Sequence, residues 1–131
     1  MMSNSVATIA LNQECVLIRA DVGDARMLFE LRNDPFVIAQ SASGRPIAWQ
    51  EHLLWFERVI SEPERNRIYF VKQNRCAIGV IRFERSDQAG ALVSIYLVES
   101  AVGRGIGTRA LVASCRDLFK SWHIDDVDAN I

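Results

Sequence analysis

The sequence predicts an α/β fold in which a mixed, mostly antiparallel sheet carries helices on both faces. Three features predict it. Segments with amphipathic helical spacing alternate with short β-branched runs, and two of those runs are joined by a tight turn. A third run, at residues 92–98, is nearly all apolar, which is typical of a central strand covered on both faces. The expected order is β-α-α-β-β-β-α-β, in one domain of 131 residues.

The first part of the chain is expected to contain a lead-in, a strand and a helix. Residues 1–13 are mostly small or polar, which favours a loose segment, and the β-branched run at 16–19 predicts a strand. Asp21 and Asp24 offer side-chain oxygens that can cap the N-terminus of a helix. Asn33-Asp34-Pro35 ends that helix, because the residue before a proline is pushed out of the α region.

A loop, a second helix and a hairpin follow. Residues 41–46 are rich in Ser, Gly and Pro and predict the loop. Apolar residues recur at helical spacing from 48 to 61, so this segment is expected to be an amphipathic helix. The strands of the hairpin are expected at 68–71 and 77–84, joined by a turn at 73–75.

The last part of the chain is expected to return to helix after the central strand. A turn is predicted at 86–90, the central strand at 92–98, a helix at 104–121 and a final strand at 124–129. A rotation of about 100° per residue predicts which side chains of the helix face the core. The expected members of that face are Leu111, Cys115, Leu118, Phe119 and Trp122.

The composition excludes several classes of protein. A net charge of −1 argues against nucleic acid as the main ligand, since phosphate binding depends on a surplus of Lys and Arg. The three cysteines are widely spaced and form no cluster with His, so no metal site is expected. No segment resembles a signal peptide or reaches the length of a membrane span, so we expect a cytoplasmic protein that binds no membrane.

A glycine-rich loop carries the strongest functional signal. The central strand is followed by a long helix. The loop before this helix and the start of the helix contain Gly103, Arg104, Gly105, Ile106, Gly107 and Thr108. Glycines let the backbone approach a ligand closely, and the first turn of a helix offers free N–H groups at its positive end. Such a site suits a pyrophosphate, to which Arg104 can add a charged contact.

Two other kinds of glycine-rich loop fit the sequence less well. A dinucleotide-binding fingerprint follows the first strand of its domain and has a third glycine where this chain has Arg109 or Ala110. A Walker A loop needs Gly-Lys followed by Ser or Thr, which is absent. The remaining alternative to a pyrophosphate site is an ordinary turn between strand and helix.

Residues 93–111 resemble motif A of the GNAT N-acetyltransferase superfamily, the strand, loop and helix that hold acetyl-CoA. The family pattern begins with Gln or Arg, has Gly three residues later and ends with Gly or Ala two residues after that. Gly105 and Gly107 match it, while Val102 stands where Gln or Arg is usual. This departure removes one side chain of the family pattern and leaves the backbone amides of the loop in place.

Residues 31–35 and 47–56 resemble the first two helices of one branch of this superfamily. That branch contains ribosomal-protein N-terminal acetyltransferases and the amino-sugar N-acetyltransferases of the pseudaminic-acid pathway. The resemblance implies transfer of an acetyl group from acetyl-CoA to a small-molecule amine, preferably an amino sugar nucleotide. The alternatives are a protein N-terminal acetyltransferase and a non-catalytic fragment that binds acyl-CoA or a partner.

The resemblance also assigns the cofactor contacts. The backbone of Ile95 and Leu97 would bind the pantetheine arm, and the amides of residues 103–108 would bind the pyrophosphate. Arg109 would reach the 3′-phosphoadenosine end of the cofactor. A strand amide would polarise the acetyl carbonyl, and a neutral amine would attack the thioester directly, without a covalent enzyme intermediate.

Five residues are candidates for proton transfer or acceptor binding. Glu84, at a strand end, is either a general base or a solvated carboxylate. Tyr96 either faces the site or packs in the core. Arg32 and Asn33 end the first helix near where relatives bind the acceptor, although helix termination explains them equally well. His52 is either an acceptor contact or a histidine of the helix surface or core.

The resemblance implies one more helix and two strands after the last expected strand, together with a Tyr that protonates the leaving thiolate. The sequence stops at Ile131, so we expect this layer, and the general acid with it, to be missing. An uncovered strand edge would favour a homodimer or a swapped oligomer through the C-terminal strand region.

Overall fold

The computed structural model describes residues 8–86, 90–124 and 126–129, which contain one six-stranded sheet. Its strands are β1 (Thr8–Ala10), β2 (Cys15–Arg19), β3 (Asn66–Gln73), β4 (Cys76–Arg85), β5 (Gly90–Leu97) and β6 (Asp126–Ala129). The strands lie side by side in the order of the sequence. Each of the first five pairs antiparallel with the next, and β6 runs parallel to β5. The predicted mixed, mostly antiparallel sheet is confirmed.

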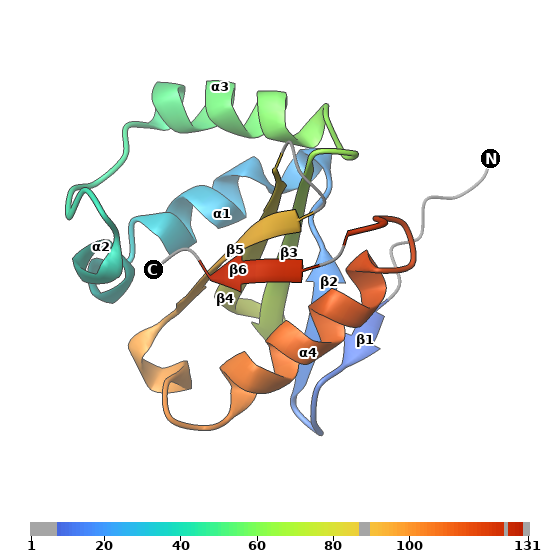
Figure 1. Ribbon diagram of the computed structural model, residues 1–131. Helices are drawn as coiled ribbons and strands as arrows, with labels where there is room; N and C mark the ends of the chain where they lie inside the picture. The colour runs from blue at the N-terminus through green and yellow to red at the C-terminus, as the bar shows by residue number, and fades with distance from the viewer. Residues whose placement is uncertain (1–7, 87–89, 125, 130–131) are drawn as a thin grey trace.

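The helices cover both faces of the sheet. One face carries α1 (Ala25–Arg32), α2 (Pro35–Gln40) and α3 (Trp49–Ile60), and the other carries α4 (Ile106–Leu118) (Figure 1). The order along the chain therefore contains one strand and one helix more than the sequence predicts. Among the described residues, none of the helices combines the length and the apolar composition that crossing a membrane requires.

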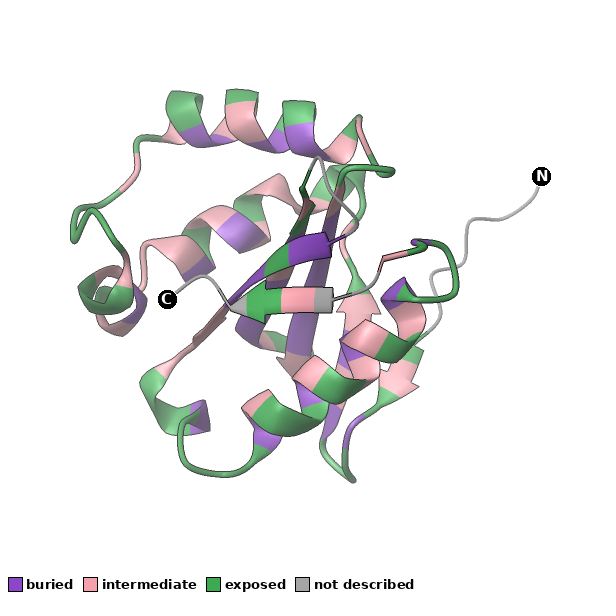
Figure 2. Ribbon diagram, in the orientation of Figure 1, coloured by how far each residue is buried: buried purple, intermediate pink, exposed green. Residues whose placement is uncertain are grey.

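Two apolar clusters fill the space between these layers. Tyr69, Phe83 and Leu118 belong to the cluster on the α4 side. Phe56 and Phe70 belong to the cluster beneath α1 and α3. Figure 2 shows that the side of α3 facing the sheet is buried and its outer side exposed. Each helix is therefore held by one apolar stripe, which stabilises the fold by roughly 1.5–3 kcal/mol per large side chain buried.

The expectation of a loose lead-in through residue 13 is wrong for its second half. Residues 8–10 form β1, which pairs with β2 from Thr8 opposite Ile18 to Ala10 opposite Val16. Ile9 packs against the apolar cluster on the α4 side. The strand is only three residues long, Thr8-Ile9-Ala10, and its pairing with β2 stabilises it. Residues 1–7 lie outside the described part of the chain.

Pro35 begins a helix as well as ending one. α1 stops at Arg32, as the proline predicts, but Asp34 then caps α2. Its Oδ1 accepts hydrogen bonds from the N–H groups of Phe36 at 2.9 Å and Val37 at 3.2 Å. Proline is well suited to the first turn of a helix because its missing N–H would have no partner there. The sequence prediction missed this short helix.

The buried face of α4 is rotated from the predicted one. Its buried residues are Ile106, Ala110, Ser114 and Leu118. Of the residues expected to face the core, Leu118 and Trp122 are buried, Leu111 and Cys115 are partly exposed, and Phe119 is 49% exposed. Small side chains at two positions of the true face let the helix approach the sheet closely. A ranking by hydrophobicity favours the larger residues beside them.

β6 lies at one edge of the sheet. It pairs with β5 from Gly90 opposite Asp126 to Val93 opposite Ala129. This pairing places the predicted final strand beside the predicted central strand. Residue 125 of that strand, and residues 87–89 of the turn expected before β5, lie outside the described residues. The homodimer expected through this region stays a prediction, which sedimentation at micromolar concentration tests.

The cap of α2 provides a test of this local structure. Asp34→Ala removes both hydrogen bonds to the first turn of α2 and is expected to lower the free energy of unfolding by about 0.5–2 kcal/mol. Asp34→Asn keeps a capping oxygen and is the matched control, expected to stay close to the wild type. Urea denaturation measures both, and equal losses for the two variants would contradict the capping role.

Candidate active site

The C-terminal half of β5 is paired on one side only. Just after β5, the N–H of Val98 donates to the carbonyl of Ile78 in β4 at 2.9 Å. Backbone groups alternate in direction along an extended strand, so those of Ile95 and Leu97 point away from β4. On that side the described residues of β6 pair with β5 no further than Val93. Among the described residues, the backbone of Ile95 and Leu97 therefore has no strand partner on that side.

The glycine loop presents unpaired amides at the start of α4. Gly103 and Gly105 have φ values of 80° and 75°, a left-handed conformation that glycine adopts without strain, and Gly105 is the N-cap of α4. The N–H groups of residues 103–108 make no hydrogen bond within the described part of the chain. The first helical bond runs from the N–H of Arg109 to the carbonyl of Gly105, at 3.2 Å. These amides, at the positive end of the helix, suit an anionic ligand.

Gly107 brings this loop close to the open part of β5. A Cβ at Gly107 would lie 3.3 Å from Cδ1 of Leu97, so a side chain there would push the helix away from the strand. The two arginines of this region bind backbone carbonyls. Arg104 donates to Ser100 at 3.2 Å, and Arg109 donates to Leu11 at 3.1 Å. The side chain of Ile106 is buried, which leaves only its backbone for a ligand.

A cavity of about 310 Å³ lies on the opposite face of the sheet, under α1, α2 and α3. It is bounded by strands β3 to β5 and by the loop before α3. The side chains of Ser94 and Tyr96 line it from β5, so it reaches the strand whose backbone edge is open. Its other lining residues are Leu28, Arg32, Val37, Ser41, Ala42, Ser43, Arg45, Ile47, Trp55, Ile68, Val80 and Arg82.

Arg32 lines this cavity and is held in place by His52. His52 itself does not line the cavity. Arg32 Nη1 lies 3.0 Å from Nδ1 of His52, and Nε2 of His52 lies 2.8 Å from the carbonyl oxygen of Ala25. Both contacts are satisfied when the neutral ring donates from Nε2 and accepts at Nδ1. His52 is fully buried, so it stands behind Arg32. Burial lowers the pKa of His52, and the nearby Arg32 lowers it further, against the raising effect of the bond to Ala25.

Asn33 holds the loop that closes one side of the cavity. Its Nδ2 donates to the carbonyl of Ile47 at 3.0 Å, and its Oδ1 accepts from the N–H of Ile47 at 2.8 Å. This pair of bonds fixes the segment before α3 against the end of α1. The side-chain amide is thus engaged with backbone, and Asn33 is not among the residues that line the cavity.

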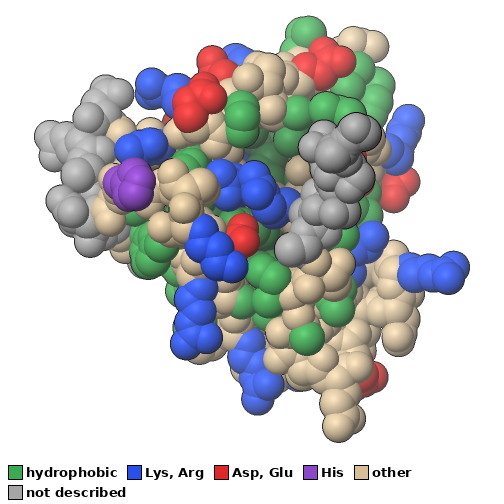
Figure 3. All heavy atoms as spheres, turned by 90° about the vertical axis from the view of Figure 1, so that its right-hand side faces the viewer, with side chains coloured by type: hydrophobic (Ala, Val, Ile, Leu, Met, Phe, Trp, Pro, Cys, Tyr) green, Lys and Arg blue, Asp and Glu red, His purple; other side chains and the backbone are tan. Residues whose placement is uncertain are grey.

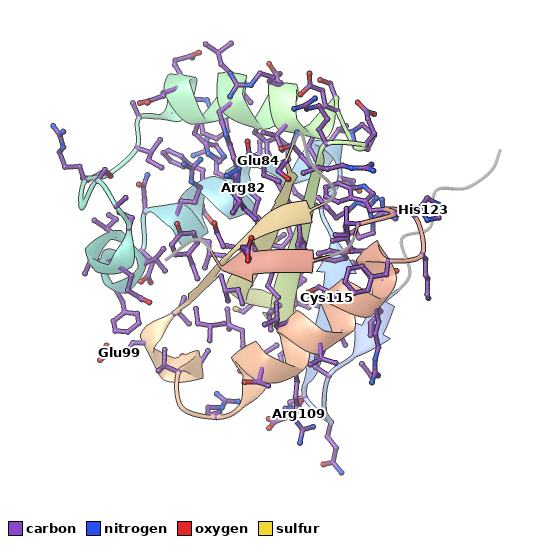
Figure 4. All side chains as sticks on the ribbon, viewed as in Figure 1. Arg82, Glu84, Glu99, Arg109, Cys115 and His123 are labelled. Atoms are coloured by element: carbon purple, nitrogen blue, oxygen red, sulfur yellow. The ribbon has the colours of Figure 1, made fainter. Side chains whose placement is uncertain are left out.

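The two candidates for proton transfer lie apart. Tyr96 lines the cavity, while Glu84 lines a smaller hollow of about 110 Å³ and pairs with Arg82 at 3.3 Å. Glu84 lies opposite Leu92 on β5, four residues from Tyr96, which is about 13 Å along a strand. Figure 4 shows Arg82 and Glu84 near α3, and Arg109 on α4, across the sheet from both.

Sequence reasoning missed Arg45, Arg82 and Ser94 as cavity residues. One available signal was Arg82, a charged residue within the otherwise apolar run 76–83 of β4. Alternation along the strand places Arg82 on the same face as Val80, and its partner across the ladder is Ser94. The loop residue Arg45 carried no comparable signal.

Comparison with known proteins identifies the family to which this arrangement belongs. A family model described as an acetyltransferase (GNAT) domain matches residues 15–131. The chain belongs to the GNAT acetyltransferase family. This confirms the family that the glycine loop and its flanks resemble, and the enzyme class, an acyl-CoA-dependent N-acetyltransferase. No curated protein sequence matches the chain.

Solved structures share the fold of this GNAT chain. An acetyltransferase from Salmonella typhimurium, which modifies the N-terminal serine of ribosomal protein L7/L12, is 20% identical, with a TM-score of 0.73 over 90% of this chain and 71% of its own. RimL, a ribosomal L7/L12 alpha-N-protein acetyltransferase in complex with coenzyme A, is 18% identical, with the same TM-score and coverage. The microcin C7 self-immunity acetyltransferase MccE, in complex with acetyl-CoA and AMP, is 23% identical, with a TM-score of 0.68 over 87% and 67%. The family and the last two complexes support acetyl-CoA as the donor.

The contact between Arg32 and His52 predicts a dependence of stability on pH. Because the pKa of His52 is lowered in the folded chain, the unfolded chain binds more protons below its ordinary pKa of about 6.5. The free energy of unfolding is therefore expected to fall between about pH 7 and about pH 5. In the His52→Gln variant, the decrease in the free energy of unfolding over this pH range is expected to be smaller.

The matched control is His123→Gln, since His123 is the other histidine and is exposed after α4. Urea denaturation of all three proteins at both pH values gives the comparison. His123→Gln should keep the wild-type difference between the two pH values. If His52→Gln also keeps the wild-type difference in the free energy of unfolding between the two pH values, the pKa of His52 is not lowered.

Proposed function

We propose that this GNAT chain transfers the acetyl group of acetyl-CoA to the primary amine of a small molecule. The observation that carries the proposal is that a donor site and an acceptor site meet at residues 94–97 of β5. The open backbone edge at Ile95 and Leu97 leads to the glycine loop. The side chains of Ser94 and Tyr96 face the cavity on the other side of the sheet.

The residues on the donor side fit the chemical groups of acetyl-CoA. The unpaired amides of residues 103–108 can donate to the pyrophosphate, at the end of α4 where the helix dipole favours negative charge. The open backbone at Ile95 and Leu97 can bind the pantetheine arm. Arg104, in this loop, is assigned to the pyrophosphate, and Arg109, on the first turn of α4, to the 3′-phosphoadenosine end. Each guanidinium would first have to leave its carbonyl partner, Ser100 or Leu11.

Acetyl-CoA supplies its acetyl group as a thioester, which a neutral amine can attack. The amine nitrogen forms the new bond, the carbon–sulfur bond breaks, and a proton must leave the nitrogen while another reaches the sulfur. Tyr96, which lines the cavity, is the better placed of the two proton-transfer candidates. Glu84 would act as a base only through intervening water, given its place in the neighbouring hollow.

The proposed acceptor is an amino sugar nucleotide, on the resemblance of residues 31–35 and 47–56. A second candidate is the N-terminus of a protein, which is favoured by the likeness to the L7/L12 acetyltransferases. A third is acyl-CoA binding without catalysis. Arg32 lines the acceptor cavity, whereas Asn33 and His52 support it from behind.

A thiol-release assay with acetyl-CoA separates these functions. The panel contains amino sugars, their nucleotide-linked forms and peptides with free N-termini. Turnover on amino sugars supports the proposed function, and turnover on peptides alone supports the second candidate. Binding of acetyl-CoA by calorimetry without turnover on any amine would overturn the proposal in favour of the third.

The glycine loop has its own test. Gly105→Glu places bulk and negative charge beside the amides that are assigned to the pyrophosphate, and is expected to abolish acetyl-CoA binding in calorimetry. Gly105→Ala is the matched control, because both variants carry the cost of a left-handed side chain, about 1–2 kcal/mol, and only one adds charge. No atom lies within 4 Å of the added Cβ, so both are expected to fold.

The alanine variant should bind acetyl-CoA measurably. If Gly105→Glu binds as well as Gly105→Ala, and both melt cooperatively, the loop is not the pyrophosphate site.

A further inference from the structure

We propose that the acceptor is an anionic amine, whose carboxylate or phosphate group binds between Arg32 and Arg82 at the wall of the cavity. The inference rests on the proposed acetyl transfer and adds the substrate class and the residues that select it.

The lining of the cavity is positive and holds no compensating acid. Arg32, Arg45 and Arg82 line it, and no Asp or Glu is among its lining residues in the described part of the chain. Arg45 lies in the exposed loop at the rim, while Arg32 and Arg82 come from α1 and β4 beneath α3. A neutral or cationic acceptor would leave these charges unmatched.

Arg32 and Arg82 converge on one side chain, the indole of Trp55. The guanidinium carbons lie 4.4 Å and 5.5 Å from the ring centroid. Such contacts orient a guanidinium but do not neutralise it. Burial lowers the pKa of Arg32 and the positive charge of Arg82 lowers it further, while Tyr96 and Glu51 raise it. An anion placed beside Arg32 would offset the two lowering effects.

The partners of the two arginines leave positive charge in the cavity. Within the described residues no carboxylate lies at ion-pair distance from Arg32, whose Nη1 contacts the neutral ring of His52. Arg82 does have a carboxylate, Glu84 at 3.3 Å, but that side chain is 54% exposed and belongs to the neighbouring hollow. His52 therefore acts as a positioning residue that holds Arg32 without cancelling its charge.

Arg67 shows how the same fold places a carboxylate beside a buried arginine. It is buried on the α4 side of the sheet, with Asp117 at 3.9 Å and the hydroxyl of Ser121 at 3.1 Å. Asp117 also accepts a hydrogen bond of 2.6 Å from the hydroxyl of Tyr69. Other Lys and Arg side chains gather on the outer face where α4 ends (Figure 3), in contact with water. Arg32 differs from Arg67 because it is only partly buried and, among the residues that the structure describes, no carboxylate lies within ion-pair distance of it.

The position of Arg82 limits how far the anion lies from the reacting amine. Arg82 is opposite Ser94 in the ladder, so Tyr96 is its diagonal neighbour. Diagonal neighbours are roughly 7–8 Å apart in an antiparallel pair. The anion is therefore expected on the same face of the sheet as Tyr96, one strand away from it.

Matched acceptors test this charge requirement. The panel of the thiol-release assay is extended with glucosamine, glucosamine 6-phosphate and glucosaminuronic acid, which share a ring and an amine. The phosphate and carboxylate forms also distinguish the two possible sources of the charge. At least one anionic form is expected to exceed glucosamine in kcat/KM by roughly tenfold or more, the effect of one charged hydrogen bond.

Arg82→Gln is expected to lower kcat/KM for that anionic acceptor by roughly ten- to hundredfold, through KM, and to leave the KM for acetyl-CoA unchanged. Arg82→Lys keeps the charge and should recover part of the loss. Arg116→Gln removes the same charge from the exposed side of α4 and is the matched control. A circular-dichroism melt of each variant establishes that it is folded.

The outcomes separate this inference from the function on which it rests. Equal turnover of neutral and anionic forms, or an anion preference that Arg82→Gln leaves intact, would overturn the inference while acetyl transfer stands. Absence of transfer to every amine of the extended panel, in folded protein, would overturn the proposed function and the inference with it.

Discussion

The backbone of β5 loses its partner on one side half-way along its length, and the rest of the structure is arranged around this constraint. An unpaired peptide group inside a protein costs free energy unless water or a ligand satisfies it. Here β4 satisfies one edge of the strand throughout, and the described part of β6 satisfies the other only as far as Val93. The remaining edge can bind an extended chain such as pantetheine by backbone hydrogen bonds alone, which is why no particular side chain is needed at Ile95 or Leu97.

Side chains alternate in direction along β5, so the two faces of the sheet have different roles. Ile95 and Leu97 pack towards α4, whose first turn carries the free amides, and Ser94 and Tyr96 face the cavity under α1 and α3. A shift of one residue in register would exchange these sets and place apolar side chains in the cavity. The pairing of β4 with β5 therefore determines both what the strand binds at its edge and what the acceptor meets.

The sequence could predict those parts of the molecule that depend on neighbours along the chain. The glycine loop and the hairpin are local, and the loop was identified from residues that are contiguous. β1 and α2 were missed because one depends on pairing with β2 and the other on a proline with two roles. The acceptor side was harder still. His52 was weighed as a possible contact, yet it is the support of Arg32, a relation set by the packing of α3 on α1.

The way in which buried charges are compensated explains why the acceptor cavity was hard to predict from the sequence. Arg67 and Arg82 both lie in strands, and although the apolar neighbours of Arg82 mark it as unusual, the sequence does not show which element packs over either arginine. The carboxylate that neutralises Arg67 comes from position 117, on a helix packed on the other side of the sheet from the cavity. Whether an arginine is neutralised within the fold or left to meet a ligand depends on which element packs over it. Arg67 and Asp117 are fifty residues apart in the sequence and meet only in the folded chain. A charged cavity is therefore identified from geometry and burial and not from composition.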